Sequence, residues 1–263
     1  MSVPVPSGSP VVSVPWRTYR SRISYVHDGL PGEMGDEPVP FERGREWVSV
    51  SVSPDGSRTL TARCEIDDSQ VERHVVYAVD AGWRPLDASI RLSVRGAFTG
   101  SGWFRFADDR AECETLMADG GRVSQRIGRR PGDQGEHATS FGAHPVACDV
   151  WHLGGYQPRG VPSDSVGHTA FMSSLLPNGA SGPMLSTMSY GVEELGVEDV
   201  VVPAGTFTCH HYRYVFDDGH PDEHVWYTGD DLILVKIRWD LLRTTYVLTE
   251  LKGDPRVGRR TPS

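Results

Sequence analysis

The segment HPVACDVWH at residues 144–152 carries the side chains of a candidate acid–base site. His144 and His152 are imidazoles, which change charge most easily near neutral pH and serve most often as general acids or bases. Asp149 could fix the tautomer of a histidine, and Trp151 could form the floor of an apolar pocket. In a strand, His144 and His152 would share a face and Asp149 would point to the other, so it would serve a histidine elsewhere. The alternative is that these are polar residues at a strand end.

A second candidate is a pair of histidines in matching contexts. His74 and His224 each precede a tyrosine by three residues, and in a strand His224 shares a face with Trp226. We therefore include His224 among the catalytic candidates and Trp226 among the substrate contacts. The competing interpretation is structural, with each histidine bonding to a nearby Asp–Asp turn.

A third candidate is the alternating series His210, Tyr212 and Tyr214. These side chains share one face of a strand, so they form a polar stripe if that face points inward and a solvated surface if it points outward. In the inward arrangement we expect Tyr212 to take part in proton transfer and His210 and Tyr214 to contact the substrate.

No metal or cofactor motif accompanies these residues. The sequence has no H-x-H or H-E-x-x-H spacing, and the neighbours His210 and His211 would point to opposite faces of a strand. It also has no G-x-S-x-G elbow, no Walker loop and no dinucleotide fingerprint in a strand-to-helix context. We expect neither a metal nor a cofactor.

The elements that position these residues are predicted to be strands. Val48, Val50 and Val52 alternate with serines up to the turn Pro54-Asp55-Gly56, and a second alternating run from Leu60 to Ile66 completes a hairpin. Similar runs predict an all-β fold, an antiparallel meander that forms a lipocalin-like curved sheet or barrel. The expected organisation is an N-terminal arm (1–16), a first β half (17–128), connecting loops with a short helix in Ala170–Leu176 (129–199), a second β half (200–252) and a disordered tail (253–263).

Two segments of the sequence match at an offset of 150 residues. Residues 63–80 read RCEIDDSQVERHVVYAVD and residues 213–230 read RYVFDDGHPDEHVWYTGD, with seven identities in 18 positions. Convergent hairpin patterns are the alternative, but Arg, His and Tyr recur at fixed spacing. The match predicts that the two β halves are pseudo-repeats.

Part of the second half resembles a known group of proteins. Val202-Pro-Ala-Gly-Thr-Phe207, Val225-Trp-Tyr227 and Leu248-Thr-Glu-Leu251 look like the strands of an uncharacterised family of bacterial lipocalin-like or lipoprotein-carrier-like β proteins. The resemblance covers about 50 residues and implies a curved sheet but no catalytic residue. Many such proteins are exported, whereas Met1–Pro15 shows no secretory pattern.

Composition limits the function further. A formal net charge of −9 disfavours nucleic acid and anionic membranes, and four isolated cysteines suit a reduced, cytoplasmic protein. Ten histidines and seven tryptophans favour a lined cavity. We expect a cofactor-independent acid–base enzyme (a hydratase, dehydratase, isomerase or other lyase) acting on a small hydrophobic molecule. The alternatives are a non-catalytic carrier of a hydrophobic small molecule and a structural module. We also expect that the protein can form a homodimer.

Overall fold

Strands make up most of the residues that the computed structural model describes, which are 17–29, 38–108, 110–128, 140–154, 168–216 and 219–253. The expected N-terminal arm and residues 254–263 of the expected tail lie outside these ranges. The strands and the two 3-10 helices of the described residues are β1 (Arg17–His27), β2 (Phe41–Val52), β3 (Arg58–Ile66), β4 (Val71–Val79), β5 (Pro85–Val94), β6 (Ala97–Ala107), β7 (Arg110–Met117), β8 (Arg122–Gly128), β9 (Ser140–Gly142), η1 (Val146–Leu153), β10 (His168–Met172), β11 (Ser186–Val202), β12 (Gly205–Val215), β13 (Glu223–Thr228), β14 (Ile233–Trp239), η2 (Asp240–Leu242) and β15 (Thr244–Lys252).

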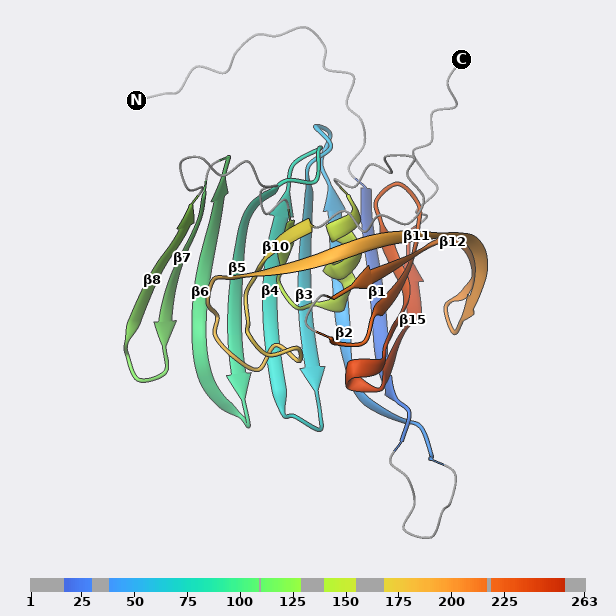
Figure 1. The fold of residues 1–263 in the computed structure, drawn as a ribbon, viewed down its shortest axis with the longest axis horizontal. Helices are drawn as coiled ribbons and strands as arrows, with labels where there is room; N and C mark the ends of the chain where they lie inside the picture. The colour runs from blue at the N-terminus through green and yellow to red at the C-terminus, as the bar shows by residue number, and fades with distance from the viewer. Residues whose placement is uncertain are drawn as a thin grey trace, which may run out of the picture.

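All the strands belong to one 15-stranded sheet in the order β8-β7-β6-β5-β4-β3-β2-β1-β15-β14-β13-β12-β11-β10-β9. It consists of two meanders, β1 to β8 and β10 to β15, joined where the first strand pairs with the last (Figure 1). The pairing is antiparallel throughout except between β9 and β10. The predicted all-β class with a large antiparallel sheet is confirmed.

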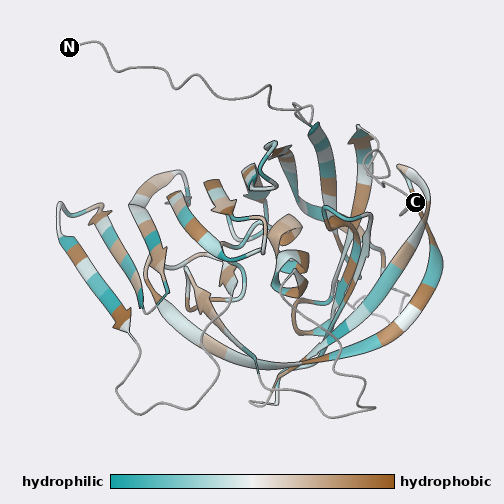
Figure 2. Ribbon diagram, turned by 90° about the horizontal axis from the view of Figure 1, so that it is seen from above, coloured by the Kyte–Doolittle hydropathy of each residue, from teal (hydrophilic) through white to brown (hydrophobic). Residues whose placement is uncertain are grey.

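The sheet is curved, and its inner face holds the core. Along β3, Leu60, Ala62 and Cys64 are buried and alternate with outward-facing Thr61 and Arg63, because successive strand residues point to opposite faces. Viewed from above, the strands bend around the coiled segment η1, and the long β11 sweeps across the open side (Figure 2).

The segment of residues 146–153 is a 3-10 helix and not a strand. Glu46 of β2 accepts hydrogen bonds from the backbone N–H groups of Val146 (3.0 Å) and Ala147 (2.8 Å), which a helix start leaves without partners. Trp151 packs between Tyr77 and Trp83, with ring centroids 5.4 and 5.6 Å away. These contacts come from the first meander, so the local sequence alone did not reveal the helix.

Two further expectations for the middle of the chain are wrong. The apolar stretch Ala170–Leu176, expected as a short helix, instead begins with the end of β10, which pairs with β9 on one side and β11 on the other. The strands resume well before Val200, since β10 begins at His168 and β11 at Ser186. Neighbouring strands supply the backbone hydrogen bonds, so tertiary pairing overrides the weak local pattern.

The loop between β10 and β11 covers the inner face of β6, β7 and β8. The Thr115 hydroxyl donates to the Pro183 carbonyl (3.0 Å), and Gln125 exchanges two hydrogen bonds with the backbone of Leu185. Gly102 lies where a Cβ would be 2.9 Å from Pro183, so the close approach requires glycine. The loop from the second meander thereby covers the inner face of the last strands of the first meander.

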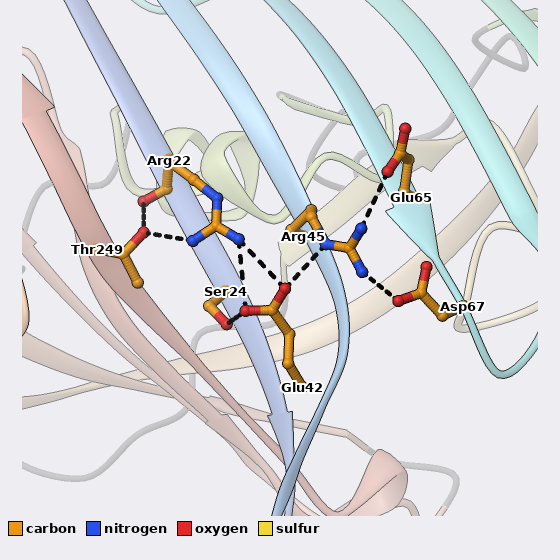
Figure 3. Close-up of polar contacts among 7 residues, drawn as sticks. All are labelled: Arg22, Ser24, Glu42, Arg45, Glu65, Asp67 and Thr249. Atoms are coloured by element: carbon orange, nitrogen blue, oxygen red, sulfur yellow. Dashed lines mark hydrogen bonds and ion pairs between the residues drawn. The ribbon is translucent and has the colours of Figure 1, made fainter.

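A polar network crosses the seam between the two meanders on the outer face (Figure 3). Glu42 accepts from Ser24 (2.5 Å), Arg22 (3.2 Å) and Arg45 (2.9 Å), while Thr249 of β15 donates to the Arg22 carbonyl (3.0 Å). Arg45 also pairs with acidic side chains of β3 and the turn after it, Glu65 and Asp67. The charged groups are partly exposed, so each ion pair adds little to stability.

The two matching segments form hairpins with the same register. Arg63 lies opposite His74, which lies opposite Arg91; Arg213 lies opposite His224, which lies opposite Arg238. Each triplet crosses three neighbouring strands.

Candidate active-site cavity

A cavity of about 270 Å³ lies between η1, the second meander and the loop after β10. Its size lies just below the roughly 300–1,000 Å³ of usual ligand pockets and therefore suits only a small molecule. The polar and aromatic residues that line it are His144, Asp149, His152, Ser174, Ser186, Thr187, Tyr190, Tyr214, His220, Glu223, Trp239 and Tyr246. The aliphatic and remaining residues are Val146, Met172, Leu175, Leu176, Pro177, Met188, Phe216 and Leu241.

Two carboxyl groups face this cavity, Asp149 from η1 and Glu223 from the start of β13. Burial raises the pKa of Asp149 well above its usual range, and the nearby carboxyls of Glu223 and Glu46 raise it further. Burial also raises the pKa of Glu223. A buried carboxyl pair of this kind holds protons at a pH where ordinary carboxyls have lost them.

His152 faces the same cavity from the last turn of η1. Its Nδ1 lies 2.7 Å from the Ser140 hydroxyl oxygen, which fixes the orientation of the ring. Burial lowers the pKa of His152 to about 4, so the imidazole is neutral at physiological pH. When Nδ1 carries the proton and donates to Ser140, Nε2 is left as the basic atom.

His144 lies just before η1 in a left-handed backbone conformation, with φ of 73°. Its Nε2 is buried and has no hydrogen-bond partner among the described residues. Burial, aided by the charge of Arg73, lowers the pKa of His144 to about 3. His144 therefore presents a neutral imidazole with an unused ring nitrogen beside the cavity.

Two tyrosines, Tyr190 and Tyr214, lie between the His152 ring and the backbone of Asp149. The Tyr214 hydroxyl donates to the backbone carbonyl of Asp149 (2.7 Å), and its ring packs edge-on against Tyr190, with centroids 5.4 Å apart. The His152 ring lies 5.7 Å from Tyr190 and 6.2 Å from Tyr214. Burial raises the pKa of Tyr190 to about 12, so it keeps its proton at neutral pH.

Glu46 holds η1 in place from below the cavity. Besides the two η1 amides, its carboxyl accepts from the Tyr25 hydroxyl (2.7 Å) and the Cys64 thiol (3.4 Å). Burial raises the pKa of Glu46, and the donated hydrogen bonds partly offset that rise. Glu46 therefore fixes the helix that carries Asp149 and His152.

The sequence candidates divide into two groups by location. His144, Asp149, His152 and Tyr214 line the cavity together. The other five do not line it: Trp151, His210, Tyr212, His224 and Trp226. Asp149 shares the cavity with both histidines because η1 is helical, so the strand-based separation of these residues is wrong.

The excluded residues have other surroundings. His224 lies on the outer face, 2.9 Å from the His211 imidazole, and His211 stacks on Trp226 with centroids 4.0 Å apart. His210 stacks on Tyr227 at 5.1 Å. Among the described residues, no group of three or more His, Cys, Asp or Glu side chains could hold a metal ion.

Comparison with known proteins identifies the fold. No family model matches the chain, and no curated protein matches it. A solved β-barrel-like protein of the domain of unknown function DUF1849, from Brucella abortus, is similar over 90% of this chain and 98% of its own, with a TM-score of 0.53 and 11% identity. The chain has a β-barrel-like fold. A Bacteroides fragilis protein with a YmcC-like fold matches over 89% of this chain and 95% of its own, with a TM-score of 0.33 and 9% identity.

This β-barrel-like fold is consistent with the expected resemblance to uncharacterised bacterial β proteins, but at such identity it carries no activity. No helix in the described part of the chain is long and apolar enough to cross a membrane.

Sequence reasoning missed three central residues of the cavity: Tyr190, Glu223 and Tyr246. A signal for Glu223 existed. It precedes His224 by one residue and stands in phase with the buried Val225, so the strand pattern places a carboxylate on the apolar face. Tyr190 and Tyr246 lie in strands distant from the other site residues, and nothing local marks them.

Proposed function

We propose that the cavity is the active site of a cofactor-independent acid–base enzyme, a lyase or isomerase acting on a small, largely apolar molecule. One observation carries the proposal: two imidazoles with lowered pKa and two carboxyls with raised pKa face one cavity. Acid–base catalysis works best when a neutral base and a protonated acid coexist at the operating pH, and opposite shifts of this kind produce that state.

The roles follow from geometry. His152 acts as general base through Nε2, because Ser140 engages Nδ1. Glu223 or Asp149, protonated, acts as general acid and donates to the oxygen of the substrate that gains charge. Tyr214 and Tyr190 give a further protonated, aromatic wall beside the base. His144 is the second imidazole candidate and adjoins the same space.

The test begins with the compound that the protein carries. Native mass spectrometry of the gently purified chain identifies it, and proton NMR follows its conversion by wild type, His152→Asn and Glu223→Gln. We expect conversion by wild type and a loss of about 100-fold or more in each variant. His224→Asn, on the outer face, is the matched control and retains activity. Unchanged conversion in both site variants contradicts the proposal.

A non-catalytic carrier is the second candidate. It is favoured by the apolar part of the wall, which includes Met172, Leu175, Leu176, Met188 and Leu241. A carrier also suits the expected lipocalin-like or lipoprotein-carrier-like character. Binding of the identified compound without any conversion by wild type would favour this candidate.

We also propose that the two halves arose by duplication. The support is the shared register of the Arg63–His74–Arg91 and Arg213–His224–Arg238 triplets. The cytoplasmic location, the homodimer and the absence of nucleic-acid and membrane partners stay predictions.

A further inference from the structure

The cavity wall has carboxyl groups but, among its described residues, no Lys or Arg side chain. The carboxyl groups are those of Asp149 and Glu223. Glu223 is only 7% exposed, yet neither its carboxyl nor that of Asp149 has a hydrogen bond or ion pair with another described residue. The cavity therefore contains two acceptor groups whose bonding capacity the protein leaves unused.

Other buried carboxyls in this chain are fully engaged. Asp231 accepts from Arg17, Arg58 and Tyr19, and Glu46 accepts from four donors. Burying a carboxyl without a partner is costly, so buried polar groups are nearly always hydrogen-bonded. The exception at Asp149 and Glu223 coincides with an open volume, which points to a partner supplied by a ligand.

We propose that the cavity binds a small organic ammonium, a primary amine with an apolar body, whose nitrogen lies between the Asp149 and Glu223 carboxyls. This inference rests on the proposed function, since it names the substrate class of the same cavity. The aromatic rings of Tyr190, Tyr214, Tyr246 and Trp239 line the same wall and suit a cation, because the face of an aromatic ring attracts positive charge. The aliphatic part of the wall accommodates the apolar body.

Two other partners fit less well. A metal ion needs a set of at least three ligands, and the described residues offer no such group. Arg73 lies close to His144 but outside the cavity wall, and its guanidinium is directed to the Gly179 carbonyl and the Ser173 hydroxyl. It does not neutralise the carboxyl pair.

Binding of an ammonium is coupled to the release of a proton from the carboxyl pair. The carboxyl pair holds protons in the empty cavity, and a bound ammonium favours its ionised form, so a proton is released to the buffer. The other titratable groups that line the same cavity are His144, His152, His220 and the cavity tyrosines, and the Glu46 carboxyl acts on Asp149 from outside the wall. The lowered pKa values of His144 and His152 leave both imidazoles uncharged, so they do not repel the ammonium.

Isothermal titration calorimetry with benzylamine and benzyl alcohol tests the inference on the full chain. We expect benzylamine to bind at least about tenfold more tightly than the alcohol, with heats that vary with the ionisation enthalpy of the buffer as proton release requires. Glu223→Gln and Asp149→Asn should each weaken benzylamine about tenfold or more. Glu72→Gln, an exposed outer-face carboxyl, is the matched control and should not.

The inference is overturned if benzylamine does not bind at millimolar concentration, if benzyl alcohol binds as tightly, or if Glu223→Gln binds benzylamine like wild type. Thermal unfolding of each variant verifies that it is folded. The two proposals fail separately. Benzylamine selectivity without conversion of the co-purified compound removes the enzyme and keeps the ammonium site. Conversion of a compound without an amine, together with equal binding of the alcohol, removes the ammonium site and keeps the enzyme.

Discussion

Arg73 and Glu223 occupy the same register position in the two matching hairpins, one with a basic side chain and the other with an acidic one. Arg73 lies opposite Cys64 and just before His74; Glu223 lies opposite Tyr214 and just before His224. Both point inward and are buried, at 2% and 7% exposure. The first half uses the position to anchor a loop, and the second half uses it to place a carboxyl group in the cavity. The inward residue beside the shared histidine, and not the histidine itself, distinguishes the two halves.

Replacing Arg73 tests the anchoring role. Arg73→Met leaves the Gly179 carbonyl and the Ser173 hydroxyl without this donor, and buried groups that lose a partner cost about 1–3 kcal/mol. We expect urea unfolding to show a loss of stability of that size. Arg91→Met, on the exposed face of β5, is the matched control and should change stability by less than about 0.5 kcal/mol. Equal effects of both variants would contradict the anchoring role.

Glu46 should matter more than any surface carboxylate. Glu46→Ala removes the acceptor of Tyr25, Val146 and Ala147 and leaves a void, so we expect a loss of about 3–5 kcal/mol in the free energy of unfolding. Glu46→Gln keeps one acceptor oxygen and should lose less. Guanidinium unfolding measures both variants. If Glu46→Ala unfolds at the wild-type midpoint, the carboxyl does not hold η1.

The neutral imidazoles predict acid sensitivity. Their folded pKa values of about 4 for His152 and about 3 for His144 lie below the unfolded value near 6.5. As pH falls below 6.5, the unfolded chain takes up protons that the folded chain refuses, so stability decreases toward those folded values. His152→Asn should show a shallower decrease in urea midpoint between pH 6.5 and 4.5. Other titrations are common to both proteins and cancel in the difference; identical slopes would contradict a neutral, buried His152.

Trp151 is expected to be structural. It is 3% exposed and lies outside the cavity wall, packed between Tyr77 and Trp83. Trp151→Ala should lower the free energy of unfolding by about 3–5 kcal/mol, as measured by chemical denaturation. Trp103→Ala, where the side chain is 46% exposed, is the matched control and should cost far less. A Trp151→Ala variant as stable as this control would show that the packing contributes little.

The strands of the sheet could be predicted from the sequence better than the helix η1 that packs on its inner face. Alternation from Val48 to Ile66 and the turn at Pro54-Asp55-Gly56 fix the β2–β3 hairpin locally, and the structure has it in that register. Residues 146–153 gave no such signal, because the helix depends on Glu46, which lies 100 residues away. A donor–acceptor match at that separation does not appear in any local pattern.

Only the part of the site whose residues are close in the sequence could be predicted. His144, Asp149 and His152 stand close in the sequence and meet in the cavity, so residue type and proximity were enough to suggest them. Glu223 and Tyr190 reach the cavity through the curvature of the second meander. His224 points outward because it alternates along β13 with the buried residues Glu223 and Val225. Its recurrence as His74 in the first half therefore did not indicate a site residue.

The pairing of β1 with β15 has a consequence for synthesis of the chain. Arg20 of β1 lies opposite Lys252 of β15, so β1 is synthesised long before the strand that pairs with it. Until then β1 has an unpaired edge, and unpaired edges are templates for pairing with other chains. A ribosome-bound or C-terminally truncated chain should therefore aggregate through β1 while its first meander is already formed.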